Sequence, residues 1–570
     1  MINFFKKYGR FEKYIPFAII TLSVIISSFL FASHSMQILS DRGRELLIPL
    51  SVLNGQVPYK DILIIYFPLA YYINAVFFGI FGSSLSAVYI IQTVYCIIFS
   101  NLFFLISKEF FNKKISLLLT LLIIESCLFS PTVFGYILPY SYSLTYGMLA
   151  SLLFVYCFVK LFKTDNKKYS YLTCFFAGAA VCFKAEFLPL IIILIAGLCL
   201  YKKESFTFYA KNLLSFFTVP FLLLITMALN GVSLQNCISA AAFGFDFTHT
   251  FSMKFFLQST GMLPNFNHDI VKTAVQSLWG VFVLISSALI YMKINSLTKN
   301  KIIIWGFALF SFMAVFLFTE PYYYTFFLPL TVFLLFLLNF KRLIKTPCEM
   351  LVVLISLFLS SKVFFGMKMN LYGTYFFPLL IISLLIFLNK YSEKIKKYDM
   401  KEIFCFIIII GLVFYSAMNF ICKKYSSYPL KSAKGVVHIP EKHGELLSAA
   451  VEYINKNTSE NDKILVLPEG SVLNFLANRP CDMKIHILDR LHYDTWGDKK
   501  SKELLEKSDY DYIILAKGFS LSDFGASDFY SEDNEVTRYL SSEYKVAAIY
   551  ENNPKENKII ILKKNKKTAF

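Results

Sequence analysis

Long apolar runs separated by short charged segments fill the sequence up to about residue 422. About 20 apolar residues cross a bilayer as a helix, and a charge held at the bilayer centre costs at least about 2.5 kcal/mol. Only 16% of the residues are charged, against roughly 25% in an ordinary soluble domain. The pattern predicts a polytopic α-helical membrane protein with about thirteen transmembrane helices. The predicted spans are 15–32, 85–106, 115–130, 144–162, 169–183, 187–201, 209–228, 273–292, 302–318, 323–339, 349–366, 372–389 and 402–421.

Lysines gather in alternate connections between these runs, such as KEFFNKK (108–114), KLFKTDNKK (160–168) and NKYSEKIKKYDMK (389–401). The other connections are poorer in Lys and Arg and include the two longest, about 34–84 and 229–272. Because Lys- and Arg-rich connections stay in the cytoplasm, we expect a multi-pass protein of the cell (inner) membrane with a cytoplasmic N-terminus. The long loops and everything after residue 422 then face outward. The net charge of +18 reflects this topology, and we expect no nucleic-acid partner.

Helix and strand patterns alternate after residue 422. GELLSAAVEYINKN has the period of an amphipathic helix, and DKILVLP, a short buried strand, follows it. KELLEKS and DYDYIILA repeat that order, and VAAIY and KIIILKK add two strand candidates. We therefore expect a transmembrane module over 1–422 and a soluble extracytoplasmic α/β domain over 423–570. The domain has no glycine-rich phosphate-binding motif, so a nucleotide is not expected.

Metal-binding patterns are weak throughout the chain. The eleven cysteines are scattered singly without a CxxC pair, and His249, His268 and Asp269 of the second long loop match no metal template. We expect neither a disulfide framework nor a structural zinc site. No cofactor is certain, and a divalent metal stays open.

The first long loop carries the chemistry-bearing residues. Asp41, Arg42, Arg44 and Glu45 follow the first predicted span directly. A turn with the order Gly-x-x-Pro-Tyr-x-Asp comes next at 55–61, then Pro-Leu-Ala-Tyr-Tyr and a stretch that stops at Phe-Gly, over 68–82. That last stretch is short for a span, and Tyr favours the membrane interface. We expect a chamber at the membrane surface with acidic and basic groups.

This order of motifs resembles the GT-C glycosyltransferases, in particular bacterial aminoarabinose transferases of lipid A and protein O-mannosyltransferases. The resemblance is best over residues 38–110 and continues more weakly through the spans and into the C-terminal domain. It implies an inverting enzyme that moves a sugar from a polyprenyl-phosphate carrier to an extracytoplasmic acceptor, which is a lipid, a glycan or a protein. The bilayer would hold the carrier's tail.

The resemblance also implies roles for individual residues. Asp41 would be the catalytic carboxylate and general base, and Glu45 could supply an acidic group that some branches have where this chain has Arg42. The donor phosphate would be bound by Arg42, Arg44, Lys60 and Lys184. The candidates for the substrate pocket are Tyr59, Asp61, Tyr66, Glu125 and Glu186. Other branches carry a Lys before the Pro-Leu segment, where this chain has Tyr66 and Phe67.

Several of these residues also have a purely structural interpretation. Asp41 and Glu45 could be interfacial charges that anchor the first helix, and Lys184 with Glu186 could be a simple ion pair. Glu125 lies in a predicted span, where an acid is a functional candidate by default. At the level of the whole chain, the alternatives are a transporter or flippase of lipid-linked glycans and a non-catalytic membrane subunit of an envelope assembly.

Overall fold

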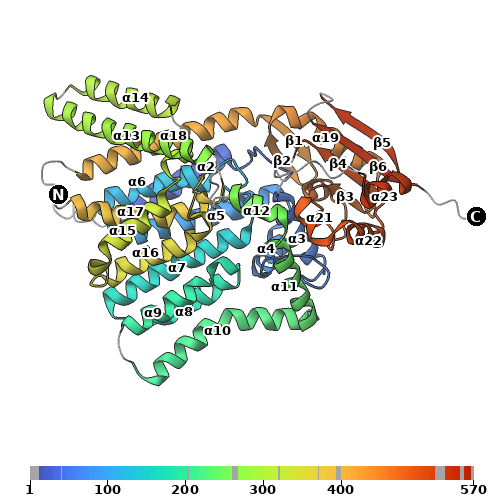
Figure 1. Ribbon diagram of the computed structural model, residues 1–570, viewed down its shortest axis with the longest axis horizontal. Coiled ribbons are helices and arrows are strands. Elements are labelled where there is room, and N and C mark those ends of the chain that lie inside the picture. The colour runs from blue at the N-terminus through green and yellow to red at the C-terminus, as the bar shows by residue number, and fades with distance from the viewer. Residues whose placement is uncertain are drawn as a thin grey trace, which may run out of the picture.

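The computed structural model describes residues 12–39, 41–201, 204–259, 263, 268–298, 300–318, 321–369, 371–392, 400–519, 533–552 and 557–565. Figure 1 shows an array of roughly parallel and antiparallel helices on the left and a domain with a β-sheet on the right. We call the end of the array next to this domain the domain face.

Each predicted apolar run forms a helix. The array contains α2 (Ile15–Phe31), α5 (Leu85–Ser107), α6 (Lys113–Ile123) with a π-helical turn η1 (Ile124–Leu128), α7 (Tyr142–Thr164), α8 (Lys168–Val181), α9 (Pro189–Tyr201), α10 (Phe206–Leu229), α13 (His268–Leu297), α14 (Lys301–Phe318), α15 (Leu328–Leu343), α16 (Pro347–Leu359), α17 (Gly373–Ser392) and α18 (Met400–Tyr425). Among the described residues, six helices are long and apolar enough to cross a membrane: α5, α7, α10, α13, α17 and α18. A polytopic helical protein is confirmed, whereas the number of thirteen spans is not.

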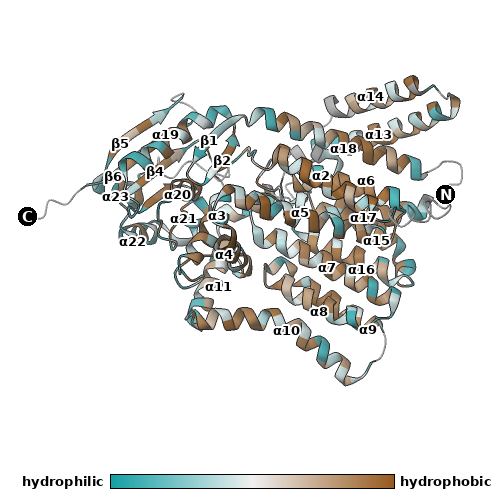
Figure 2. Ribbon diagram, turned by 180° about the vertical axis from the view of Figure 1, so that it is seen from behind, coloured by the Kyte–Doolittle hydropathy of each residue, from teal (hydrophilic) through white to brown (hydrophobic). Residues whose placement is uncertain are grey.

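Burial separates the centre of the array from its edge. Most residues of α7 are buried, and α7 packs against α5 and α8. In contrast, α10 and α13 expose large apolar side chains such as Phe206, Leu229 and Leu278. Figure 2 shows hydrophobic residues along the helices of the array and more hydrophilic ones in the domain. Exposed apolar helices are stable where lipid is the solvent, which agrees with a membrane location.

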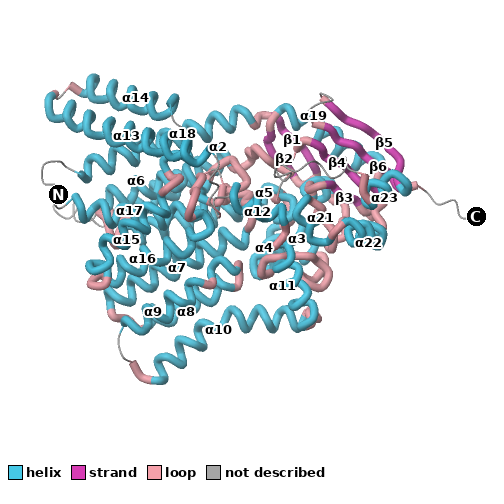
Figure 3. Tube along the Cα trace, viewed as in Figure 1, coloured by secondary structure: helices cyan, strands magenta, loops and turns pink. Residues whose placement is uncertain are grey.

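The two long loops fold into short helices at the domain face. The first contains α3 (Arg42–Leu53) and α4 (Leu69–Phe81), and the second contains α11 (Leu234–Thr248) and α12 (Phe251–Ser259). Figure 3 shows α3, α4, α11 and α12, together with most of the longer loops, between the array and the sheet. They therefore lie where the array and the domain meet.

The C-terminal domain combines helices and strands, as predicted. A hairpin of β1 (Tyr428–Ser432) and β2 (Gly435–Ile439) precedes a four-stranded sheet in the order β3-β4-β6-β5. Strands β3 (Ile464–Leu467) and β4 (Tyr512–Lys517) are parallel, and β6 (Lys558–Lys564) is antiparallel to β4 and to β5 (Tyr544–Glu551). All four residues of β3 are buried, as expected of a strand covered on both faces. The helices are α19 (Glu441–Asn457), α20 (Ser471–Ala477), α21 (Arg490–Trp496), α22 (Asp498–Ser508) and α23 (Glu535–Glu543).

Two close contacts fasten the domain to the start of the first long loop. Backbone hydrogen bonds join Ser35 and Ser33 to His438 of β2, at 2.8 and 2.7 Å. Helix α3 then rests on the beginning of α20, where a Cβ on Gly43 would lie 2.1 Å from the backbone nitrogen of Val472. Only a glycine permits this approach of α3 to the domain. Ser33, Ser35 and Gly43 are thereby held against the domain.

Candidate active site

Asp41 lies immediately before α3, where the array meets the domain. Its backbone has φ +57° and ψ −44°, an uncommon conformation for a residue with a side chain. The Asp41 amide N–H donates to Oε1 of Glu469, which belongs to the turn between β3 and α20. The Asp41 carboxylate pairs with the Arg44 guanidinium at 3.1 Å and keeps 28% of its side-chain surface accessible. Asp41 is thus fixed through its backbone and open at its carboxylate.

Arg44 is oriented by a buried acid one residue further along α3. Its Nε lies 3.3 Å from Oε1 of Glu45, and one terminal nitrogen donates to the Tyr140 carbonyl at 2.9 Å. Glu45 is 1% exposed and also accepts hydrogen bonds from the Tyr71 hydroxyl (3.1 Å) and the Tyr142 amide (2.7 Å). Glu45 therefore acts in the structure as the anchor that aims Arg44 and ties α3 to the beginning of α7.

A second cluster of charges lies beside Arg44. The Lys184 ammonium is 3.2 Å from Glu186, and Lys362, in the turn η4 (Ser360–Val363), is 2.5 Å from the same carboxylate. Lys184 also lies 2.5 Å from the Tyr140 hydroxyl and 4.4 Å from the centre of the Tyr66 ring. The Arg44 guanidinium stacks on the Tyr66 ring at 5.5 Å, so Tyr66 contacts both cations. Three basic side chains from distant segments thus converge on this part of the domain face.

Burial gives Lys184 an unusual protonation behaviour. It is 5% exposed, and burial lowers its pKa to about 7, although the charge of Glu186 opposes that shift. For Glu186, burial alone would raise the pKa, but the two neighbouring lysines prevail and lower it to about 2. Glu186 therefore stays ionised, whereas Lys184 exchanges its proton near neutral pH.

Two further carboxylates approach Asp41 from the C-terminal domain. Burial raises the pKa of Asp41, with the charge of Asp489 adding to the effect and Arg44 opposing it. Burial and the charge of Asp41 raise the pKa of Glu469 well above its usual range. Burial also acts on Asp489, but His492, whose Nδ1 lies 2.7 Å from the carboxylate, lowers the pKa of Asp489 on balance. Glu469, Asp489 and Lys362 are the residues of this site that sequence reasoning missed.

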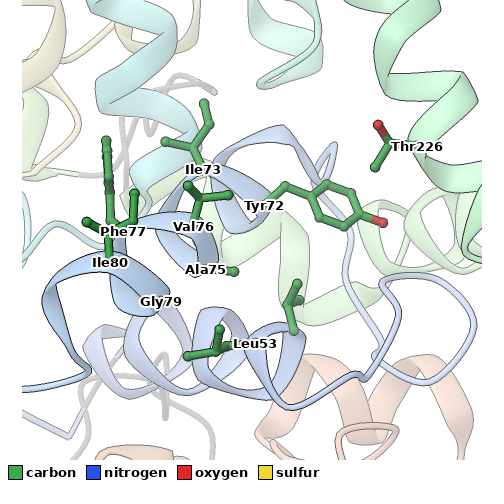
Figure 4. A pocket seen from close by; sticks show the side chains of 10 residues that line it. Leu53, Tyr72, Ile73, Ala75, Val76, Phe77, Gly79, Ile80 and Thr226 are labelled. Carbon is green, nitrogen blue, oxygen red and sulfur yellow. The ribbon is translucent and has the colours of Figure 1, made fainter.

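An apolar groove of about 630 Å³ runs along α4. Val52 and Leu53 of α3, several residues of α4 and Thr226 of α10 line it. Figure 4 shows the Tyr72 side chain directed from α4 toward Thr226, while Val76 and Ile80 lie further along α4. The opposite side of α4 faces the charged site, because the neighbouring Tyr71 contacts Glu45. One short helix therefore separates an apolar groove from the charged cluster.

The family comparison agrees with this architecture. Residues 67–231 match the family described as dolichyl-phosphate-mannose-protein mannosyltransferase. The structure is also similar to the oligosaccharyltransferase of Archaeoglobus fulgidus in the apo form, with a TM-score of 0.50 and 11% identity over 88% of this chain and 70% of that one. The resemblance to the GT-C glycosyltransferases is confirmed.

Other comparisons give a similar picture. The Archaeoglobus enzyme in complex with Zn and sulfate matches with a TM-score of 0.50 and 12% identity, over 94% of this chain and 72% of that one. ArnT from Cupriavidus metallidurans, bound to undecaprenyl phosphate, matches with a TM-score of 0.43 and 10% identity over 97% of this chain and 98% of that one. No curated protein sequence matches. At 11% and 12% identity, the two Archaeoglobus structures show a shared fold.

Arg42 occupies a place unlike that of Arg44. It is 3% exposed and donates to the carbonyls of Leu138 (2.8 Å) and Thr132 (2.7 Å) and to the Ser35 hydroxyl. These bonds fasten α3 to the loop between η1 and α7. Because its donors already have partners, Arg42 is not part of the phosphate site that we propose below.

The turn at 55–61 lies next to the site. Tyr59 has φ +67°, and its hydroxyl donates to the Tyr66 carbonyl at 3.0 Å. Asp61 closes the turn by accepting the Val57 amide at 2.9 Å, and Lys60 is exposed near Gly231. Tyr59 therefore braces Tyr66, Asp61 shapes the turn, and Lys60 lies at its surface.

Glu125 joins helices of the array. It accepts hydrogen bonds from Ser27 of α2 at 2.7 Å and from Asn419 of α18 at 3.1 Å. Such bonds between helices satisfy polar groups inside a membrane. In the structure, Glu125 has the contacts of a helix-packing residue, and a place in the substrate pocket stays a prediction.

Metal ligation is not evident in the described part of the chain, where no group of three or more His, Cys, Asp or Glu side chains is arranged to hold an ion. His268 and Asp269 begin α13, but their side chains lie outside the described residues. His249 follows α11, and its Nδ1 lies 2.7 Å from the Phe245 carbonyl, as in a helix cap.

Proposed function

We propose that this chain is an inverting glycosyltransferase that moves a sugar from a polyprenyl-phosphate carrier to an acceptor outside the membrane. The observation that carries the proposal is the convergence of Asp41 and Arg44 with Lys184 and Lys362 at one face of a GT-C fold. A carboxylate and several cations are what transfer from a lipid phosphate requires. The acceptor is a lipid, a glycan or a protein.

Asp41 is proposed as the general base. Its carboxylate would take the proton of an acceptor hydroxyl or amine while that oxygen or nitrogen attacks the anomeric carbon. The bond between the anomeric carbon and the phosphate oxygen breaks in the same displacement, so the configuration inverts. Burial raises the Asp41 pKa, which makes the carboxylate a stronger base, and its accessible surface lets an acceptor approach. A positioned base supplies about 10²–10⁴-fold in rate.

Arg44, Lys184 and Lys362 are proposed to bind the donor phosphate and to stabilise it as it leaves. Cations in a partly desolvated site interact with a phosphate far more strongly than they would in water. Arg44 is suited to two hydrogen bonds with one phosphate, because its guanidinium is planar. Glu45 and Glu186 are proposed to position these cations rather than to contact the reacting atoms.

The groove along α4 is proposed to hold part of the carrier's apolar tail. Its lining residues are almost all apolar, and α10, which borders it, exposes apolar side chains. A polyprenyl chain that lies there would keep its hydrocarbon out of water. The charged head would then reach the other side of α4, where the cations lie.

The orientation proposed from the lysine pattern fits the placement of the site. Tyr142, the first residue of α7, contacts Glu45, whereas the Lys-rich segment 160–168 begins near the other end of this 23-residue helix. At about 1.5 Å per residue, the two ends are roughly 33 Å apart, the thickness of a bilayer core. If the Lys-rich end is cytoplasmic, the site faces outward.

The test uses the purified full-length chain in lipid nanodiscs with defined polyprenyl-phosphate sugars and a panel of acceptors. We expect the wild type to release polyprenyl phosphate and to form a glycosylated product, and Asp41→Asn to lose at least about 100-fold in rate with an unchanged melting temperature. Asp533→Asn, an exposed carboxylate of the domain, is the matched control and should stay active. A wild type inactive with every donor, or a fully active Asp41→Asn variant, would refute the proposal.

A further inference from the structure

Glu469 brings a carboxylate of the C-terminal domain into direct contact with the proposed base. Its Oε1 accepts the Asp41 amide N–H, across 428 residues of sequence. The side chain is 6% exposed. The contact is to the Asp41 backbone, so the Asp41 carboxylate stays free for Arg44 and for substrate. Glu469 therefore fixes the position of the Asp41 backbone and leaves its carboxylate free.

The turn that carries Glu469 is itself firmly placed. It follows the buried strand β3, and a Cβ on the next residue, Gly470, would lie 2.4 Å from the Val466 side chain and 3.6 Å from Leu39. Helix α20, directly after the turn, packs against α3 at Gly43. Glu469 thus projects from a rigid support toward Asp41.

Asp41 needs such a support because of its backbone. A positive φ with a negative ψ is sterically unfavourable for a residue that has a Cβ, and it persists only where the surroundings enforce it. If the amide were released, the residue could relax to an ordinary conformation, and its carboxylate would turn away from Arg44.

We propose that Glu469 is a positioning residue of the transfer reaction, which holds Asp41 through its amide so that the carboxylate faces Arg44 and the substrate. This inference rests on the proposed function of Asp41 as the base. It makes the C-terminal domain a part of the catalytic machinery, because the domain supplies the hydrogen-bond acceptor that positions Asp41.

The charge state of Glu469 suits this role. Burial and the neighbouring Asp41 raise the pKa of Glu469 well above its usual range, which favours the neutral acid. A neutral acid still offers a carbonyl oxygen to the amide and adds no second negative charge beside Asp41. Glutamine has the same shape and the same acceptor oxygen, so it should replace Glu469 in this function.

The experiment compares three variants of the full-length protein in nanodiscs. Glu469→Met fills a similar volume without an acceptor oxygen, Glu469→Gln keeps the oxygen, and Glu452→Gln is the control at an exposed site of the same domain. We expect Glu469→Met to lower kcat at least about tenfold with the donor KM nearly unchanged, and Glu469→Gln and Glu452→Gln to stay within about threefold of the wild type.

Hydrogen exchange of peptides that cover residues 38–45 gives a readout without activity. Exchange should accelerate in Glu469→Met and stay at the wild-type rate in Glu469→Gln and Glu452→Gln. A Met variant with wild-type kcat or exchange, or a folded Gln variant as impaired as the Met variant, would overturn the inference. If the wild type transfers no sugar, the proposed function fails, and exchange still decides whether Glu469 holds Asp41. If the Met variant does not fold, the Gln variant alone decides.

Discussion

Lys184 gives a test of the phosphate site through pH. It lies between the Tyr66 and Tyr140 rings, and burial lowers its pKa from 10.5 to about 7. That shift corresponds to a cost on the order of 5 kcal/mol for the charged form. As pH rises through 7, the free enzyme loses this cation. We expect kcat/KM for the donor to fall between pH 6 and pH 9 by about 10- to 100-fold, which is the contribution of one hydrogen bond to a charged group. It should then level off, because the Arg44 guanidinium stays charged.

Lys184→Arg isolates the cause, because a guanidinium stays protonated throughout this range. Steady-state kinetics of this variant should show no decline between pH 6 and pH 9, whatever its absolute rate. Lys499→Arg, at an exposed position of α22, should keep the decline of the wild type. A wild type with flat kcat/KM, or a decline that survives in Lys184→Arg, would contradict the reasoning.

A change in the stability contribution of Lys184 cannot produce the expected decline of kcat/KM. The unfolded chain has the ordinary lysine pKa near 10.5, whereas the folded chain has a pKa of about 7 at this residue. Between these values the unfolded state binds more protons, so the contribution of Lys184 to stability rises with pH. The destabilisation is complete below pH 7 and fades progressively as pH rises from 7 toward 10.5. Activity and this stability term therefore change in opposite directions over the same range.

Two substitutions at the beginning of α3 test how the loop is held. Arg42→Ala should lower the free energy of unfolding by about 2–5 kcal/mol, because buried carbonyls lose their donor. Thermal unfolding in detergent measures this loss of stability. A loss below about 1 kcal/mol would contradict the anchoring role of Arg42. Gly43→Ala should cost about 1–3 kcal/mol and abolish transfer, since its Cβ would lie 2.1 Å from the Val472 nitrogen. Gly244→Ala, whose Cβ would meet nothing within 4 Å, should leave both unfolding and transfer intact.

The helices of the array could be predicted because apolar length and local caps are properties of a short stretch of sequence. The predicted run 85–106 became α5, and the run 209–228 became α10 with three more residues at its beginning. The caps explain these boundaries, since the hydroxyls of Ser84 and Ser205 accept amides of the first turns. The number of spans could not be read in this way. Helix α16 has only 13 residues, and whether such a helix crosses depends on its neighbours.

The residues of the site also divide into those that local sequence predicts and those that it does not. Asp41, Arg44 and Glu45 lie within one helical turn, so their proximity follows from sequence spacing alone, and Lys184 and Glu186 also form the ion pair that their spacing allowed. Glu469 and Lys362 reach the site from far along the chain, and no local period predicts that contact. Lys362 did carry a signal that went unused, because a lone ionisable residue inside an apolar run is a functional candidate.

Charge balance then indicates which carboxylate at the site can serve as a base. Asp489 is held by His492, which lowers its pKa and makes it a weak base. Burial and the charge of Asp41 raise the pKa of Glu469 well above its usual range, which favours its protonated form and disfavours it as a base. Asp41 lies between these extremes, because burial raises its pKa while Arg44 favours the ionised form, and 28% of its side-chain surface is accessible. Of the three, Asp41 combines a raised pKa, an adjacent cation that favours its ionised form and a carboxylate within reach of an acceptor, and Asp489 of the C-terminal domain contributes to the raised pKa.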